Sequence, residues 1–379
     1  MTDARRLEQV GFWLIAASLA TAQIKLMAAQ VLFGLAAIVW VILATRERRF
    51  DVPGFFWPLV AFGVVTLASA AFSGDPVASL IDCKQLVLYL MVPLVARLAR
   101  GERAMKTLNA ILAVGAVGAL IGVTEYVLFG YDNLDKRPTG SLSHYMTYSG
   151  VIMLALGAAV ARLLFYWDRL IWPAVAVPAM LVALAVTQAR NAWIGALAAI
   201  GALLATKRLK LLLALPVFVA LVMFVAPASL RDRAFSIFDP NNPTNRDRFV
   251  MLRMGRHIVA DHPWFGVGPD RIKVVYEDYR PADAVNPRNP HLHNVPVNIA
   301  AERGLPALAV WIWFITVAAR DLFKQVRQGH DKALAAAGLA AVVGMLVAGL
   351  FEYNFGDSEF LMLFLGLITL PFAARAGAR

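Results

Sequence analysis

The chain has 379 residues, of which 60% are hydrophobic and 16% are charged, and its formal net charge is +11. A soluble domain of this size carries about 25% charged residues, and here the apolar residues come in long blocks, so the composition excludes an ordinary soluble protein and predicts an all-α integral membrane protein. The basic residues lie in separate segments between the blocks, as membrane topology requires, so no nucleic-acid partner is expected. The single cysteine, Cys83, excludes an internal disulfide.

Apolar blocks long enough to be transmembrane helices recur along the whole chain, and about twelve can be placed. They cover residues 9–25, 27–45, 55–73, 79–97, 105–129, 145–166, 170–187, 191–206, 209–227, 305–320, 332–352 and 358–374. The chain therefore divides into nine helices in residues 1–227, a long loop in residues 228–304 and three helices in residues 305–379. The loop is expected to be partly helical, because RFVMLRMGRHIVADHPWFGVG has helical periodicity that ends at Pro and Gly.

The distribution of basic residues predicts the topology. If Arg5 and Arg6 are cytoplasmic, every short loop on the same side is basic, and Arg375 near the C-terminus lies there too. Both ends are therefore predicted to be cytoplasmic, and residues 228–304 to lie on the opposite face. Long loops cross the membrane largely regardless of charge, and loops of about 77 residues in a compact protein are usually functional or disordered.

Arginines on the predicted helix 246–261 fall into two sets. Arg246, Arg253 and Arg256 share one side, whereas Arg248 heads an otherwise apolar stripe. Arg248 either snorkels at the membrane interface or points inward at an anionic ligand, which a guanidinium engages through its fork of donors.

Two further polar stretches interrupt the apolar segments. TQARNAW, residues 187–193, places Arg190 close to the membrane plane, where a charge is costly unless it is paired or faces a wet cavity. The alternative is a simple outer-loop arginine. KRPTGSLSHYMTYSG, residues 136–150, brings Arg137 and His144 to the start of a membrane helix, and its tyrosines suit an interfacial belt.

The densest polar stretch is HLHNVPVNIAAERG, residues 291–304. If it is helical from His293, then Asn294, Asn298 and Glu302 form one stripe, and Glu302 lies opposite His293. A direct pair of these two is not expected, and Glu302 should orient the stripe or pair with an arginine. His293 suits general-base catalysis, although structural hydrogen bonding by His291 and His293 is the alternative. The two histidines could also bind a metal, but no third ligand is spaced nearby, so no metal is expected.

Together these motifs resemble the O-antigen ligase family, within the O-antigen ligase/polymerase superfamily of bacterial envelope glycosyltransferases. The resemblance rests on HNxxVxxxxExG from His293, on the arginine-led helix that ends in HPWFGVG at 262–268, on QARNAW around Arg190 and on RPTGSLSHYMTYSG at 137–150. The chain departs from the family at Leu252, where an aromatic is frequent, and at Val297, where leucine is usual.

The resemblance implies a GT-C-like enzyme that moves an O-antigen glycan from undecaprenyl diphosphate to a lipid A–core sugar, at the periplasmic face of the inner membrane. The reaction is expected to invert the anomeric centre and to need neither metal nor cofactor. By carry-over, His293 would activate the acceptor hydroxyl, and Arg190 and Arg248 would stabilise the departing diphosphate. The remaining substrate-binding residues would be Arg137 and His144 at the donor, Asn294 and Glu302 as positioning groups, His291 beside the base, and Arg246, Arg253 and Arg256 for the phosphorylated acceptor.

Three other functions compete with this interpretation. An O-antigen polymerase and a protein O-oligosaccharyltransferase would use the same lipid carrier with a different acceptor. A polytopic transporter or flippase belongs to another class, and it would need charged residues near the bilayer midplane and access from both faces. The charged residues of interest gather on one face here, which favours glycosyl transfer.

Overall fold

The computed structural model describes residues 3–47, 50–166, 172–329 and 331–376, and all regular elements in these ranges are helices. The α-helices are α1 (Asp3–Thr21), α2 (Leu26–Glu47), α3 (Phe56–Ala71), α4 (Pro76–Asp82), α5 (Met91–Leu98), α6 (Glu102–Phe129), α7 (Tyr145–Phe165), α8 (Trp172–Val186), α9 (Arg190–Lys207), α10 (Ala214–Val225), α11 (Ala228–Phe235), α12 (Pro243–Asp261), α13 (Ile272–Tyr279), α14 (Val295–Gln328), α15 (Lys332–Ala348) and α16 (Ser358–Ala376). Three 3₁₀ segments join them, η1 (Cys83–Leu90), η2 (Leu209–Leu213) and η3 (Asn354–Gly356).

The helices fit an integral membrane protein. Among the described residues, six helical runs are long and apolar enough to cross a bilayer, and four shorter apolar helices accompany them. Each predicted segment falls on a helix or a run of helices, although residues 170 and 171 of the seventh lie outside the described ranges. The number of spans and the GT-C-like class remain predictions. The boundary at residue 352 is wrong, because α15 ends at Ala348 and Gly349 caps it.

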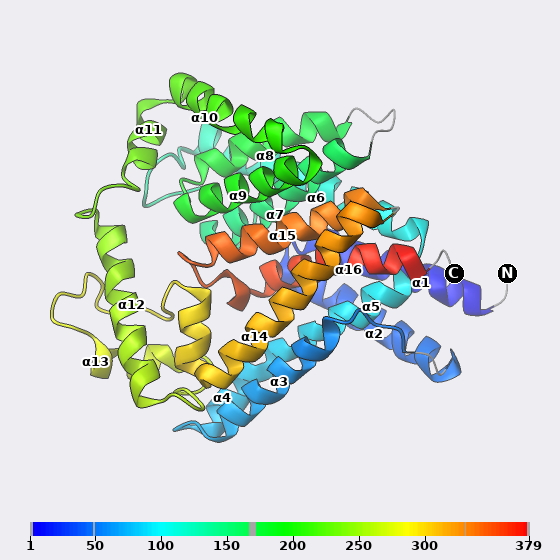
Figure 1. The fold of residues 1–379 in the computed structure, drawn as a ribbon, viewed down its shortest axis with the longest axis horizontal. Coiled ribbons are helices and arrows are strands. Elements are labelled where there is room, and N and C mark those ends of the chain that lie inside the picture. The colour runs from blue at the N-terminus through cyan, green and yellow to red at the C-terminus, as the bar shows by residue number, and fades with distance from the viewer. Residues whose placement is uncertain (1–2, 48–49, 167–171, 330, 377–379) are drawn as a thin grey trace.

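Small residues allow the central helices to pack closely. Helix α15 packs on α7 and α9, and α14 packs along α3 (Figure 1). A Cβ atom on Gly195 of α9 would lie 2.5 Å from the Met153 sulfur of α7 and 2.9 Å from the Gly344 carbonyl oxygen of α15. Close approach through small residues is the usual way in which helices associate in a membrane, where burial of apolar surface contributes little.

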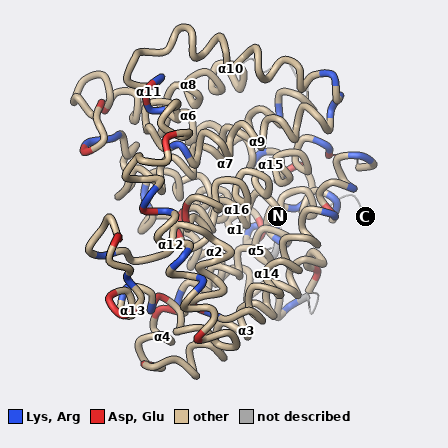
Figure 2. The backbone as a smooth tube through the Cα atoms, turned by 60° about the vertical axis from the view of Figure 1, so that its left-hand side comes forward, with Lys and Arg blue, Asp and Glu red and all other residues tan. Residues whose placement is uncertain are grey.

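One end of the bundle carries the long loop, and we call it the loop end. Helices α12 and α13 lie there, whereas α1 begins and α16 ends at the opposite end (Figure 1). The loop is ordered around an apolar cluster of its own, which includes Met251, Met254, Ile258 and Tyr276. Charged residues gather at the loop end and again at the opposite end (Figure 2).

The opposite end holds basic residues that the topology prediction placed in the cytoplasm. Arg97 forms an ion pair with Glu8 at 2.6 Å, and Arg100 forms one with Asp51 at 3.3 Å. These contacts bring the start of α1 and the segment before α3 to the same end as the residues after α5.

Candidate active site

A break in α14 shapes the centre of the loop end. Gly304 has a φ of +81°, and the residues on either side are helical. The HPWFGVG segment takes up the backbone groups that the break frees. Its hydrogen bonds run from Val267 N to Ala301 O at 3.0 Å, from Gly268 N to Glu302 O at 2.9 Å and from Leu305 N to Pro263 O at 2.8 Å. Unpaired backbone groups are costly when buried, so this motif serves to satisfy the broken helix.

The short helix before the break begins with a cap that also fixes His293. The Asn294 side chain accepts from Val297 N at 3.0 Å and donates to Leu350 O at 2.9 Å. Val295 N donates to Gly349 O at 2.6 Å. His293 comes directly before this cap and has a φ of +49°, a conformation that costs energy and persists only where its surroundings enforce it. The asparagine side chain therefore ties His293 to the segment after α15.

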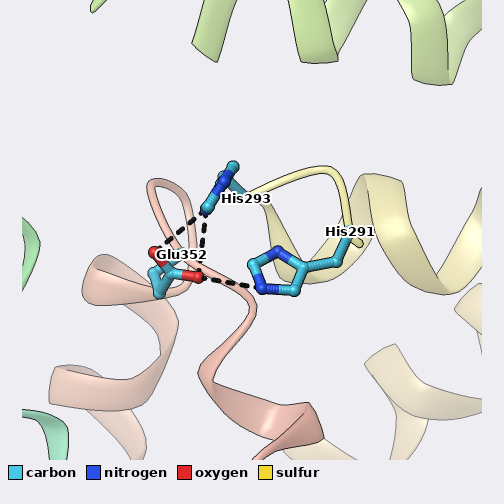
Figure 3. Close-up of side chains that lie close together, drawn as sticks. All are labelled: His291, His293 and Glu352. Carbon is cyan, nitrogen blue, oxygen red and sulfur yellow. Dashed lines mark hydrogen bonds and ion pairs between the residues drawn. The ribbon is translucent and has the colours of Figure 1, made fainter. Parts of the chain in front are cut away.

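His291, His293 and Glu352 converge on one another (Figure 3). The His293 Nδ1 atom lies 3.0 and 3.1 Å from the two carboxylate oxygens of Glu352, and the His291 Nε2 atom lies 3.7 Å from Oε1. The imidazole rings of the two histidines meet edge to face, with centroids 4.5 Å apart. We call these three residues the histidine–glutamate cluster.

The cluster keeps Glu352 ionised. Burial opposes ionisation of this carboxyl, which is only 6% exposed. His293, His291 and Arg248 outweigh burial and lower the pKa of Glu352 to about 2. Burial lowers the pKa of His291, against the attraction of Glu352. When the Glu352 carboxylate accepts a hydrogen bond from Nδ1 of His293, Nε2 is the ring atom that can take a proton.

The same cluster corrects the expectation that the histidines lack a third metal ligand. One ligand atom from each of the three residues lies within 4.8 Å of the others. Two imidazoles and a carboxylate are a donor set that Zn²⁺ accepts. Arg248, whose Nη2 atom lies 3.9 Å from the Glu352 carboxylate, puts a positive charge beside the same oxygens, which disfavours a cation.

Glu302 lies in a different environment from the one around Glu352. Its carboxylate pairs with Arg303 at 2.6 Å, and Arg303 also donates to the Tyr353 hydroxyl at 3.2 Å. Pairing with an arginine was one of the two expectations for Glu302. The structure gives it no contact with His293 among the described residues, so it does not position that ring directly.

Beside the histidine–glutamate cluster lies a cavity of about 120 Å³ that four arginines line, Arg137, Arg190, Arg233 and Arg248. We call it the arginine cavity. Its arginines come from four elements: the segment before α7, the start of α9, α11 and α12. Ala189 and Asn191 also line it, so the N-terminus of α9 faces the cavity. Helix N-termini and guanidinium groups both favour anions, and no carboxylate lines the cavity in the described ranges.

Protein groups hold two of these arginines firmly. Arg190 donates to the Ser236 carbonyl oxygen and to Asn245 Oδ1, both at 2.7 Å. Arg248 donates to the Phe351 carbonyl oxygen at 2.8 Å and lies 3.9 Å from Glu352. Arg248 therefore points inward, as one of its two interpretations expected, and it connects the cavity with the cluster.

Arg137 is placed by the turn that precedes α7. Its guanidinium lies 4.1 Å from the centre of the Tyr145 ring, a cation–π contact. The Glu125 carboxylate accepts from Thr139 N and Gly140 N at 2.6 and 2.9 Å, which fixes this turn. His144 caps α7 through Nδ1, which accepts from Met146 N at 3.2 Å, and it is not among the residues that line the cavity.

The other three arginines of α12 lie outside the cavity. Arg246, Arg253 and Arg256 are all exposed, and Arg253 forms an ion pair with Asp283. The helical spacing predicted this separation from Arg248 correctly.

Two residues of the site were missed by the sequence analysis. Glu352 was assigned to the end of a membrane helix, and its position after an apolar block was the available signal, because carboxylates in such places usually have a partner. Arg233, in ASLRDRAF, carried no pattern that distinguished it from the neighbouring Arg231.

Comparison with known proteins links part of the chain to a family. Residues 175–312 match the family model described as O-antigen ligase, a range that includes Arg190, Arg233, Arg248 and both histidines. No curated protein matches the chain. The match confirms the resemblance found in the sequence motifs and supports the O-antigen ligase superfamily for residues 175–312.

Proposed function

We propose that the protein is an O-antigen ligase, which transfers the O-antigen glycan from undecaprenyl diphosphate to a sugar of the lipid A–core. The observation that supports this most is the junction of the arginine cavity with the histidine–glutamate cluster. Arg248 lines the cavity and contacts both Phe351 and Glu352, so an anion bound in the cavity would lie next to the imidazole of His293.

The chemistry needs a base and a stabilised leaving group. The acceptor hydroxyl oxygen forms a bond to the anomeric carbon while the bond from that carbon to the diphosphate oxygen breaks. The hydroxyl proton moves to Nε2 of His293, and the electron pair of the broken bond leaves with undecaprenyl diphosphate. Arg190 and Arg248 stabilise the negative charge that develops there, and Glu352 stabilises the imidazolium. A single displacement of this kind inverts the anomeric centre.

In this proposal the loop end faces the periplasm and both chain termini are in the cytoplasm of the cell, with the helices in the inner membrane. The basic residues at the opposite end support this orientation through the positive-inside rule. The apolar helices around the arginine cavity then hold the donor lipid in the bilayer. Arg246 and Arg256 are exposed at the loop end and would attract the phosphorylated acceptor, an effect that salt should weaken.

Product formation by purified protein tests the proposal. The substrates are undecaprenyl-diphosphate glycan and lipid A–core in detergent, with and without EDTA. We expect ligated product from wild type in both conditions, and a loss of at least about 100-fold in His293→Ala, Arg190→Ala and Arg248→Ala. Arg231→Ala is the matched control, since this exposed arginine of α11 lies outside the site.

Each alternative gives a different product. Growth of the glycan on its lipid carrier, without lipid A–core, would indicate a polymerase. Transfer only to an added pilin would indicate a protein O-oligosaccharyltransferase. Loss of product in EDTA, restored by Zn²⁺, would make the histidine–glutamate cluster a metal site. No product from wild type with any acceptor would favour a transporter.

A further inference from the structure

We infer that Arg233 of α11 is a further ligand for the phosphate groups of the donor, a role that rests on the proposed function. The sequence motifs did not indicate this residue. Its placement in the arginine cavity, its free donors and the charges around it all support the assignment.

Arg233 has free donors that Arg190 lacks. Its side chain is buried, and its Nε atom donates to the Gln188 carbonyl oxygen at 3.2 Å, which fixes the direction of the guanidinium. Within the described ranges, the two terminal nitrogens of Arg233 have no hydrogen-bond partner, although the group lines the cavity. Those of Arg190 are both used, by Ser236 and Asn245. Arg233 therefore offers a fixed fork of N–H groups to a ligand.

Most of the charged groups near Arg233 are positive. Burial lowers the pKa of Arg233 to about 10, and repulsion from Arg190, Arg137 and Arg248 adds to this effect. The guanidinium is still charged at neutral pH. Four positive groups line one cavity, and none of its lining residues in the described part of the chain is a carboxylate, so a ligand with more than one negative charge would relieve their mutual repulsion.

The repulsion among these arginines makes it possible to distinguish a ligand-binding role of Arg233 from a structural role. If Arg233 serves mainly to hold α11 through Gln188, its loss should destabilise the free protein. If it is a phosphate ligand, removing its charge relieves repulsion in the free protein and harms only the complex. The two roles thus predict opposite changes in the thermal midpoint of the ligand-free protein.

The test measures binding of undecaprenyl diphosphate to the purified full-length chain. Arg233→Gln should weaken this binding by about 10- to 100-fold, the range for a lost hydrogen bond to a charged group. Its thermal midpoint without lipid should equal or exceed that of wild type. Undecaprenyl monophosphate should discriminate less between the two proteins, because it has fewer oxygens to engage. Arg231→Gln, two residues away on the same helix, should bind as wild type does.

Failure of this inference can be told apart from failure of the proposed function. Wild-type affinity in Arg233→Gln, together with weak binding in Arg248→Ala, would overturn the role of Arg233 alone. A lower ligand-free midpoint in Arg233→Gln would also overturn it, in favour of the structural role. No binding of undecaprenyl diphosphate by wild type would overturn the proposed function, and the inference with it.

Discussion

Two buried glutamates, Glu302 and Glu352, show how differently two regions of one site are built. Glu302 belongs to the break in α14 and pairs with Arg303, the next residue in the chain. Glu352 belongs to the segment between α15 and α16, and it holds His293, which lies 59 residues earlier. The glutamate inside the polar motif supports the backbone and its neighbour, whereas the glutamate outside it contacts the candidate base. Closeness in sequence to a catalytic residue is therefore a poor guide to partnership.

Neutralising Glu352 should have the largest effect on catalysis. Glu352→Gln should lower kcat for glycan transfer by about 10²- to 10⁴-fold, because glutamine cannot stabilise the imidazolium and can present its amide to Nδ1. The measurement is initial rate at saturating donor and acceptor. Glu302→Gln, assayed on the folded fraction, should change kcat by less than about tenfold. Near-normal turnover in Glu352→Gln would remove Glu352 from the mechanism.

The second prediction concerns the stability of the region around Glu302. Removing one partner of a buried ion pair leaves the other charge uncompensated, so Glu302→Gln should destabilise the protein by about 3–5 kcal/mol. Thermal unfolding in detergent measures the change. The double variant Glu302→Gln/Arg303→Met, which removes both charges, should recover most of the loss. A double variant as unstable as the single one would show that Arg303 contributes through contacts other than this pair.

The smallest effect should come from Asp357, which lies in the same segment as Glu352. Burial raises the pKa of Asp357 to about 7; the Thr147 hydroxyl, which donates to this carboxylate at 2.8 Å, opposes the rise, and Glu359 and Glu352 add to it. A carboxyl whose folded pKa is raised stabilises the protein fully below its unfolded pKa, near 4, and this contribution is lost as pH rises through 7.

Thermal midpoints between pH 5 and pH 8 test this prediction. Relative to Asp357→Asn, the wild-type protein should lose stability as pH rises towards 7, by an amount on the order of 1 kcal/mol per pH unit. Asp232→Asn, a change at an exposed residue of α11, should leave the slope unchanged. Equal slopes in wild type and Asp357→Asn would mean that Asp357 does not titrate in this range.

The apolar helices could be predicted because each of them follows from its own composition. The predicted end of α15 failed because residues 349–351 continue the apolar run of the helix. In the fold, this segment leaves the helix and its backbone contacts Val295, Asn294 and Arg248 instead. Helical spacing on α12 separated Arg248 from the other three arginines and left its inward orientation as one of two interpretations. These features depend on sequence patterns within a single segment of the chain.

The rest of the site depends on how the bundle closes. Arg233 and Arg231 look alike in sequence, and only the packing of α11 against the segment at Gln188 turns Arg233 into the cavity. The HPWFGVG segment contains a histidine and aromatic residues that suggest chemistry, yet its backbone is what the broken helix needs. Contacts between segments far apart in the chain do not appear as a periodic pattern in the sequence.

The position of Glu352 has a consequence for biogenesis. Every arginine and histidine of the site is synthesised before this carboxylate, and the carboxylate arrives only with the final pair of helices, α15 and α16. A nascent chain that has inserted α14 thus carries the whole set of motif residues and lacks the group that organises His293. In the proposed mechanism the site is complete only once α15 and α16 are in place, so a chain that stops after α14 should not transfer glycan.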